Sequence, residues 1–172
     1  MELSLERCVI RSWRLTDAPD LAREADDRTI WINVRDRMPS PYTLAHAVAY
    51  VSSASAADPE CNFAITVDGR VAGSIGLTYG TDIYRLTAEV GYWLGAEWRG
   101  RGIASDALSS LAEWVFATTP IVRLHASVFI WNPASARVLE KARFRLESTA
   151  RKAAIKNGEI VDEWVYVRLR DD

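Results

Sequence analysis

The 172-residue chain has few of the features that mark metal, redox, secreted or membrane proteins. It contains two cysteines, Cys8 and Cys61, and neither stands in the spacing of a metal or redox motif. This favours two free thiols in a reducing compartment. No apolar run reaches the ~18 residues that a membrane-spanning helix needs, and the first residues contain no apolar signal core. We therefore expect a cytoplasmic protein with no membrane partner.

An excess of charge of one sign is also lacking. The chain has 21 Lys and Arg against 23 Asp and Glu, a net charge of −2, so no nucleic-acid partner is expected. The only histidines, His46 and His125, stand alone in the sequence, which indicates structural or surface roles and no metal site. The hydrophobic share of 49% and charged share of 26% are typical of a globular protein. The length fits one domain over residues 1–172.

Hydrophobic periodicity switches between the strand and helix patterns along the chain, without an internal repeat or linker. Asp68-Gly69 and Asn157-Gly158 predict tight hairpin turns, and Thr43 and Asn132 are expected to cap helices. The predicted elements are a strand at 10–15, a helix starting at Thr16 or Asp17 and continuing with weaker patterning to about residue 32, a helix from 43, strands at 63–67, 71–77 and 86–94, a helix at 103–118, a strand at 122–129, a helix at 134–141, and strands at 144–155 and 160–169. This order predicts an α/β fold on a mixed sheet.

The most informative segment is the loop Arg99-Gly100-Arg101-Gly102-Ile103-Ala104, which joins a predicted strand to a predicted helix. Glycines let backbone N–H groups approach an anion, and a helix N-terminus adds partial positive charge. The two arginines add full charge and forked donors. The loop is neither a Walker loop nor the G-x-G-x-x-G dinucleotide fingerprint. It favours a ligand that carries a pyrophosphate, with a plain strand-to-helix turn as the alternative.

Several separated motifs resemble the GNAT superfamily of N-acetyltransferases. Arg99, Gly102 and Ala104 match its Gln/Arg-x-x-Gly-x-Gly/Ala signature. Segments 41–43 (Pro-Tyr-Thr), 88–94 (Ala-Glu-Val-Gly-Tyr-Trp-Leu) and 132–141 (Asn-Pro-Ala-Ser-Ala-Arg-Val-Leu-Glu-Lys) are similar to the RimL-like branch, which includes enzymes that acetylate the N-terminal amine of ribosomal proteins. The resemblance implies a single α/β (α+β) domain with a mixed, mostly antiparallel sheet, flanking helices and two splayed strands.

The resemblance also implies acetyl-coenzyme A as cosubstrate, with no metal. Its pantetheine arm would pair with the exposed backbone of the splayed strand, and its pyrophosphate would sit on the backbone amides of the glycine loop. The Asn132 side chain would lie near the pantetheine arm. The implied cofactor-binding residues are thus Tyr92, Trp93, Leu94, Arg99, Gly100, Arg101, Gly102, Ile103, Ala104 and Asn132.

Two residues are candidates for proton transfer. Glu89 lies in an otherwise apolar strand and is the candidate general base, with an ordinary strand carboxylate as the alternative. Many family members use a tyrosine to protonate the leaving thiolate, and Leu139 stands at that position here. Ser135 matches a serine proposed for this role in the RimL-like branch, with a locally bonded helix serine as the alternative. A second departure is Arg143, where the family usually has a glycine.

The acceptor implied by the resemblance is a primary amine. A protein or peptide N-terminus comes first, and a small amine (a polyamine, amino acid, amino sugar or antibiotic) is the alternative. Residues 29–42 are expected to shape acceptor choice. A non-catalytic acyl-coenzyme A sensor or interaction module is a second class of function, and an ATP-binding protein is a third that lacks a magnesium-ligating pattern. Edge strands near the C-terminus leave room for a homodimer.

Overall fold

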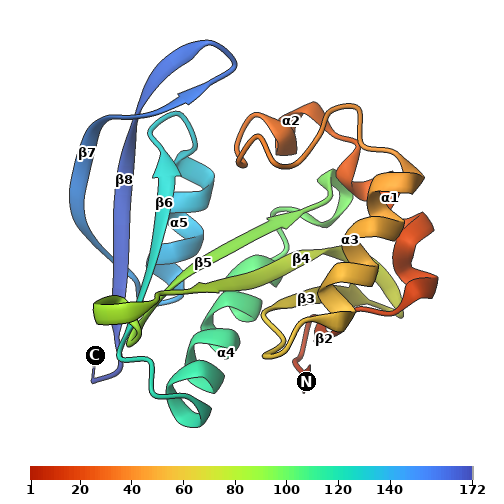
Figure 1. The fold of residues 1–172 in the computed structure, drawn as a ribbon, viewed down its shortest axis with the longest axis horizontal. Coiled ribbons are helices and arrows are strands. Elements are labelled where there is room, and N and C mark those ends of the chain that lie inside the picture. The colour runs from red at the N-terminus through yellow and green to blue at the C-terminus, as the bar shows by residue number, and fades with distance from the viewer. Residues whose placement is uncertain (172) are drawn as a thin grey trace. The chain divides into compact units, whose positions relative to one another are not determined.

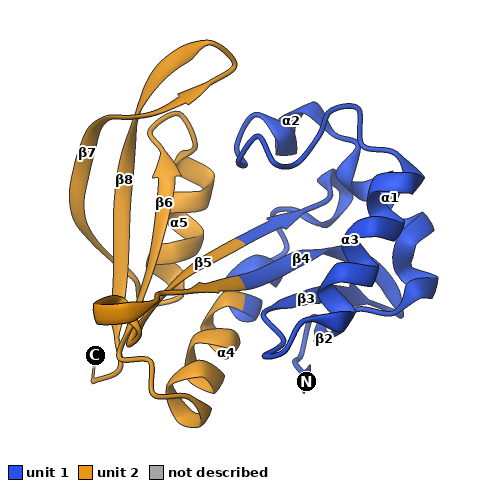
Figure 2. Cartoon of the chain, in the orientation of Figure 1, with its two compact units in different colours: residues 1–76, 92–107 blue, residues 77–91, 108–172 orange. Residues whose placement is uncertain are grey.

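The computed structural model describes residues 1–171, which form two compact units. Unit 1 contains residues 1–76 and 92–107, and unit 2 contains residues 77–91 and 108–172 (Figure 2). The strands form an eight-stranded sheet in the order β1-β2-β3-β4-β5-β6-β8-β7, and β5 with β6 is a parallel pair in a mostly antiparallel arrangement. This sheet with flanking helices confirms the predicted fold class, whereas the single domain over residues 1–172 stays a prediction.

The helices and strands follow the predicted order closely (Figure 1). They are β1 (Glu2–Ser4), β2 (Val9–Ser12), α1 (Ala18–Ala25), α2 (Arg28–Trp31), α3 (Leu44–Ala56), β3 (Asn62–Val67), β4 (Arg70–Tyr79), β5 (Thr87–Leu94), α4 (Ile103–Thr118), β6 (Arg123–Phe129), α5 (Pro133–Lys141), β7 (Arg145–Lys156) and β8 (Glu159–Leu169). Short 3-10 helices are η1 (Leu15–Asp17), η2 (Asp82–Tyr84) and η3 (Ala96–Trp98).

Unit 1 is built on the antiparallel strands β1 to β4, with α1 and α3 packed on one face (Figure 1). Its core cluster joins Trp13, Leu21, Val51 and Val71. The predicted turn between β3 and β4 has positive φ at both central residues, as a tight hairpin requires. Thr43 caps α3 as predicted, because its hydroxyl accepts the His46 N–H at 3.3 Å.

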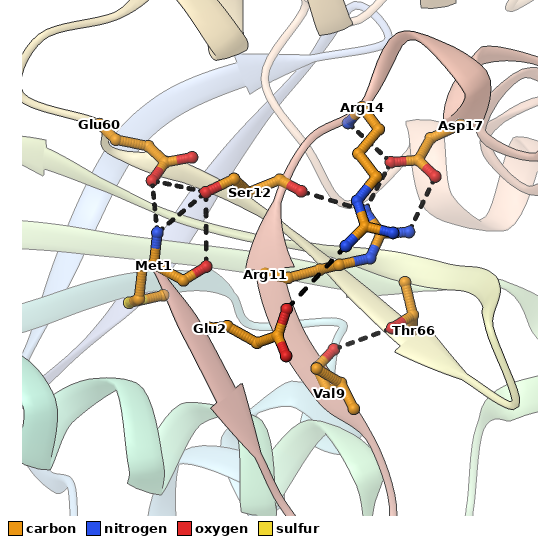
Figure 3. A network of polar contacts seen from close by, with 9 residues as sticks. All are labelled: Met1, Glu2, Val9, Arg11, Ser12, Arg14, Asp17, Glu60 and Thr66. Carbon is orange, nitrogen blue, oxygen red and sulfur yellow. Dashed lines mark hydrogen bonds and ion pairs between the residues drawn. The ribbon is translucent and has the colours of Figure 1, made fainter.

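The N-terminal part of unit 1 is held by a polar network (Figure 3). Arg11 and Asp17 form a buried two-pronged ion pair at 2.7 and 2.8 Å, and Asp17 also accepts the Arg14 backbone N–H at 2.9 Å. Asp17 is the residue before α1, as predicted for a cap, but its carboxylate makes no cap bond to that helix. The Asp17 carboxylate forms the ion pair with Arg11 instead.

Unit 2 contains the parallel pairing of β5 with β6 and the antiparallel order β6-β8-β7. Its core combines buried residues of α4, β6, α5 and β8: Leu108, Leu111, Val115, Leu124, Val128, Leu139 and Tyr166. The second predicted hairpin turn also has positive φ at both central residues, Asn157 and Gly158. The alternation of β6 buries Leu124 and Ala126 and leaves His125 half-buried on the opposite face.

Besides shifted element ends, three details differ from the sequence predictions. The helix predicted to continue to about residue 32 is divided into α1, which ends at Ala25, and α2, which Asp27 caps. The short β1 was missed because three residues carry too little periodicity. On α3, the helical spacing of Leu44, Ala47, Val48 and Val51 predicts one buried face, yet Leu44 and Val48 are exposed. The buried stripe of this helix is narrow and consists of Ala47, Val51 and Ala54. Among residues 1–171, no helix is long and apolar enough to cross a membrane.

Candidate active site

The glycine loop of unit 1 has the backbone conformation that the sequence predicts. Gly100 and Gly102 have φ of +73° and +80°, values that favour glycine. The Asp106 N–H donates to the Gly102 carbonyl at 3.1 Å and begins the intrahelical hydrogen bonds of α4. The N–H groups of Ile103, Ala104 and Ser105 therefore have no acceptor within the helix and point out of its N-terminus. That end of α4 carries the partial positive charge of the helix dipole.

The side chain of Arg99 is engaged within unit 1. Its Nε donates to the Leu94 carbonyl at 2.9 Å, and its other two nitrogens reach Thr29 Oγ1 at 2.8 Å and Asp27 Oδ2 at 3.0 Å. The sequence predicts a forked phosphate donor at Arg99. The fork instead ties the loop to the start of α2, because Asp27 presents a fixed carboxylate there.

The Asp27 carboxylate is itself ordered, because it caps α2. It accepts the backbone N–H and the hydroxyl of Thr29, both at 2.7 Å. Burial opposes its ionisation, but these hydrogen bonds and the Arg99 charge outweigh burial and lower the pKa of Asp27. Asp27 is therefore charged at neutral pH and holds Arg99 as an ion pair.

Two other arginines surround the loop in unit 1. The Arg101 guanidinium lies 5.4 Å from the centre of the Trp98 ring, which is buried against the loop. Arg7 lies beside Gly102, and its Nη1 pairs with Asp106 at 2.5 Å. Sequence reasoning missed Arg7, because nothing in its local pattern links it to a loop so distant in the chain.

The end of β5 lies against β4 within unit 1. A Cβ on Gly73 would collide with the Trp93 carbonyl and would come within 2.8 Å of the Leu94 side chain, so glycine is needed there. The Gly95 N–H donates to the Ala72 carbonyl at 2.9 Å. This contact fixes the direction in which Tyr92, Trp93 and Leu94 lead into η3 and the loop.

The first half of β5 belongs to unit 2 and carries Glu89. In the parallel pairing Glu89 lies opposite His125 on β6, and both residues are half-buried. Burial lowers the pKa of His125, although the charge of Glu89 acts in the opposite direction. His125, for which the sequence indicates a structural or surface role, is thus the neighbour of the predicted base Glu89 on the adjacent strand.

The start of α5, also in unit 2, confirms the predicted cap. The Asn132 side-chain carbonyl accepts the Ser135 N–H at 3.2 Å, and Pro133 follows the cap. At the other end, Arg143 keeps the left-handed conformation with φ +65°, where the family usually has glycine. The Phe144 N–H bonds the Leu139 carbonyl at 2.9 Å and the Arg143 N–H bonds Glu140 at 3.0 Å, the Schellman pattern.

The predicted site residues are thus divided between the units. Unit 1 brings together Tyr92, Trp93 and Leu94 with the whole glycine loop, from Arg99 to Ala104. Unit 2 brings together Glu89 with His125, and Asn132 with Ser135. Within the described part of the chain, no group of three or more His, Cys, Asp or Glu side chains is arranged to hold a metal ion.

Two relatives of similar sequence have names that state an acetyltransferase activity. The chain is 29% identical over 105 residues to the L-amino acid N-acetyltransferase AaaT of Escherichia coli (strain K12), covering 60% of this chain and 65% of that protein. It is 33% identical over 85 residues to the ribosomal-protein-serine acetyltransferase of the same strain, covering 49% of this chain and 48% of that protein. Both alignments span less than two thirds of the relative.

Solved structures share the fold over the full length. An acetyltransferase of the GNAT family from Bacillus anthracis superposes with a TM-score of 0.88 at 22% identity, covering 100% of both chains. RimL, a ribosomal L7/L12 α-N-protein acetyltransferase in complex with coenzyme A, superposes with a TM-score of 0.86 at 20% identity, covering 98% of both chains. The family model of the acetyltransferase (GNAT) domain matches residues 7–145. The chain therefore belongs to the GNAT acetyltransferase family.

Proposed function

We propose that the protein transfers the acetyl group of acetyl-coenzyme A to a primary amine. Membership of the GNAT family, whose members are acyl-coenzyme A-dependent acetyltransferases, supports this reaction class. The observation that carries the proposal is the start of α4 in unit 1. There a strand, a left-handed glycine loop and a helix N-terminus follow one another, and three helix N–H groups have no intrahelical acceptor.

The residues at this loop fit a pyrophosphate. Gly100 has open space at its Cβ position, and the N–H groups of residues 103–105 are directed out of the helix. The ring of Trp98 supports the exposed Arg101 side chain, and Arg7, which also pairs with Asp106, places a second guanidinium beside Gly102. We assign phosphate binding to the loop amides from Arg99 to Ala104 and to Arg101 and Arg7. The Arg99 side chain has the different task of holding the loop to α2.

The pantetheine arm is assigned to the backbone of Tyr92, Trp93 and Leu94 and to the Asn132 side chain. Asn132 uses its carbonyl oxygen to cap α5, which leaves its NH₂ group with two N–H donors for a ligand. An amide-containing arm offers the carbonyl acceptors that such donors need. The capping bond also orients the donor, because it fixes the rotation of the side chain.

When bound, acetyl-coenzyme A supplies a thioester whose carbonyl carbon a neutral amine attacks. Backbone N–H groups at the end of β5 polarise that carbonyl. An ammonium nitrogen must lose two protons to become an amide nitrogen, and Glu89 accepts them in turn, directly or through water. The C–N bond forms and the C–S bond breaks. The sulfur takes one proton, for which the Ser135 hydroxyl is the candidate donor. One of the two protons from Glu89 restores that hydroxyl through water, and the other leaves to solvent.

The acceptor we propose first is the N-terminal α-amine of a protein or peptide. The segments 41–43, 88–94 and 132–141 that are similar to the RimL-like branch support it, as does the relative named as a ribosomal-protein-serine acetyltransferase. A free small amine is the second candidate, favoured by the relative named as an L-amino acid N-acetyltransferase. A sensor that binds acyl-coenzyme A without transfer is the third candidate.

The test is release of free thiol from acetyl-coenzyme A in the presence of pooled peptides with varied N-termini or a panel of free amines. Glu89→Gln is assayed beside Glu113→Gln, a matched change at an exposed carboxylate on α4 whose ion pair with Arg168 is long, at 3.6 Å. Release with peptides alone supports the first acceptor, and release with free amines alone supports the second. Saturable cofactor binding without release from either pool would favour the sensor.

A further inference from the structure

We propose that His125 is a positioning residue for Glu89, and that it takes over the first proton that Glu89 removes from the acceptor ammonium group. This inference rests on the proposed acetyl transfer and adds to it a second proton-holding group. The two residues would act as a pair, with Glu89 facing the amine and His125 storing the proton.

The pairing of β5 with β6 brings the two side chains together. Glu89 and His125 are partners in the parallel register, next to the pairs Thr87–Arg123 and Ala88–Leu124. Neighbouring strands lie about 4.8 Å apart, and partners in register point to the same face. The buried neighbours Ala88 and Leu124 take the opposite face, so the carboxylate and the imidazole share the half-buried one. The Glu89 carboxylate does not bond His125 Nδ1 in this structure, so proton transfer between the two side chains needs a side-chain rotation or a bridging water.

The imidazole has a nitrogen that the fold leaves unused. Nδ1 of His125 is buried and has no hydrogen-bond partner among the described residues. Leaving a buried polar atom without a partner is unfavourable, and such atoms are few in native proteins. This unpartnered nitrogen is the atom that we assign to hold the proton.

The charges around His125 favour storage of a proton that arrives from Glu89. Burial lowers the pKa of His125, so the ring is neutral at rest and can accept a proton. The groups that act on it are Glu89 on β5, Arg123 on its own strand and Glu147 on β7, while β8 presents the apolar Val167 in register. Arg123 is neutralised by its two-pronged pair with Glu147 at 2.8 and 2.6 Å. The adjacent carboxylate that stabilises an imidazolium is therefore that of Glu89.

The proton step balances without a further reactant. The ammonium N–H bond breaks and an O–H bond forms on Glu89. That proton then passes to His125 Nδ1, which leaves an imidazolium beside a restored carboxylate. Glu89 can accept the second proton when the C–N bond forms, and this proton can restore the Ser135 hydroxyl through water after that hydroxyl has protonated the leaving sulfur. His125 releases the first proton to water after the product leaves.

The decisive kinetic experiment is the pH profile of kcat and kcat/KM for one amine, measured for the wild type, His125→Gln, His125→Asn and the control His46→Gln. General bases contribute about 10²–10⁴-fold, so we expect both His125 variants to lower kcat about tenfold or more and to shift the acidic limb. The KM for acetyl-coenzyme A should stay constant, and His46→Gln should follow the wild type. Parallel profiles for all four proteins would overturn the proposal.

A second measurement does not depend on turnover. The imidazole proton resonances are titrated by NMR, and His46→Gln assigns the two rings. Because the Glu89 charge raises the pKa of His125, Glu89→Gln should lower that pKa, whereas Glu113→Gln should not. An unchanged His125 titration in Glu89→Gln would refute the pair even if acetyl transfer is observed. A wild type that transfers nothing while the titration shifts would refute the proposed function but not the coupling.

Discussion

Removal of the Asp17 charge should destabilise the protein strongly. Arg11 and Asp17 are 9% and 8% exposed, and their side chains make two parallel hydrogen bonds at 2.7 and 2.8 Å. Asp17→Asn leaves the Arg11 guanidinium buried with two neutral acceptors, the Ser12 carbonyl and the amide carbonyl at position 17, and with an NH₂ group facing its own N–H donors. Breaking a buried ion pair on one side costs about 3–5 kcal/mol, a large share of the ~5–15 kcal/mol that stabilises a typical domain.

Urea unfolding measures this loss directly. With a slope of about 2 kcal/mol per M, a loss of 4 kcal/mol lowers the midpoint by about 2 M. Glu2→Gln is the matched control, because the Glu2–Arg14 pair has a separation of 4.0 Å and both side chains are 62% exposed. Such a surface pair is worth about 0–1 kcal/mol. If Asp17→Asn costs no more than Glu2→Gln, the reasoning about burial is wrong.

The pH dependence of the same difference gives a second check. Burial by itself raises the pKa of Asp17, but hydrogen bonds from Arg11 and from the Arg14 backbone, with their charges, lower it below the ordinary value of 3.8. A carboxyl group whose pKa is lower in the folded state stabilises that state at pH values above the pKa it has in the unfolded state. This contribution disappears as the pH falls through the pKa of the folded state. The difference between wild type and Asp17→Asn should therefore be constant near neutral pH and shrink below about pH 4.

Three further pairs of substitutions test local geometry. Arg143→Gly should stabilise the protein by about 0.5–1 kcal/mol, because glycine relieves the left-handed conformation, whereas Arg143→Ala should give no gain in thermal unfolding. Asp27→Asn keeps a capping side chain and loses only the ion pair with Arg99, so it should cost under about 1 kcal/mol in urea unfolding, and Asp27→Ala should cost about 1 kcal/mol more. Gly73→Ala should cost about 1–3 kcal/mol because its Cβ would collide with a backbone carbonyl, while Gly91→Ala, which has open space, should unfold like the wild type. Equal unfolding midpoints within any of these pairs would contradict the corresponding explanation.

Most of the fold could be predicted because its signals are local. The two hairpins follow from Asp68-Gly69 and Asn157-Gly158, residues that tolerate the positive φ found at all four positions. Thr43 and Asn132 cap helices through short side chains that reach only their own backbone. The role of Asp17 could not be predicted in the same way. An aspartate just before a helix can cap that helix or pair with a distant cation, and the local sequence is the same in both cases.

The candidate site could be predicted less completely from the sequence, because its interactions join segments that are distant in the chain. The glycine loop could be identified from its own residues, but the engagement of the Arg99 side chain depends on Asp27 and Thr29. Likewise, His125 has no neighbour in the sequence that points to a function, and only strand pairing places it beside Glu89. The tertiary fold sets the partners of the charged side chains in such a site, and a local sequence pattern does not contain that information.

The measurement that tests the central claim most directly is transfer of the acetyl group itself. Purified protein is incubated with acetyl-coenzyme A and the peptide pool, free thiol is followed over time, and the peptides are weighed by mass spectrometry. We expect thiol release matched by peptides heavier by one acetyl group at the N-terminal amine, a strong loss in Glu89→Gln, and wild-type rates in Glu113→Gln. Saturable binding of acetyl-coenzyme A with no acetylated peptide or free amine, or full activity in Glu89→Gln, would contradict the account.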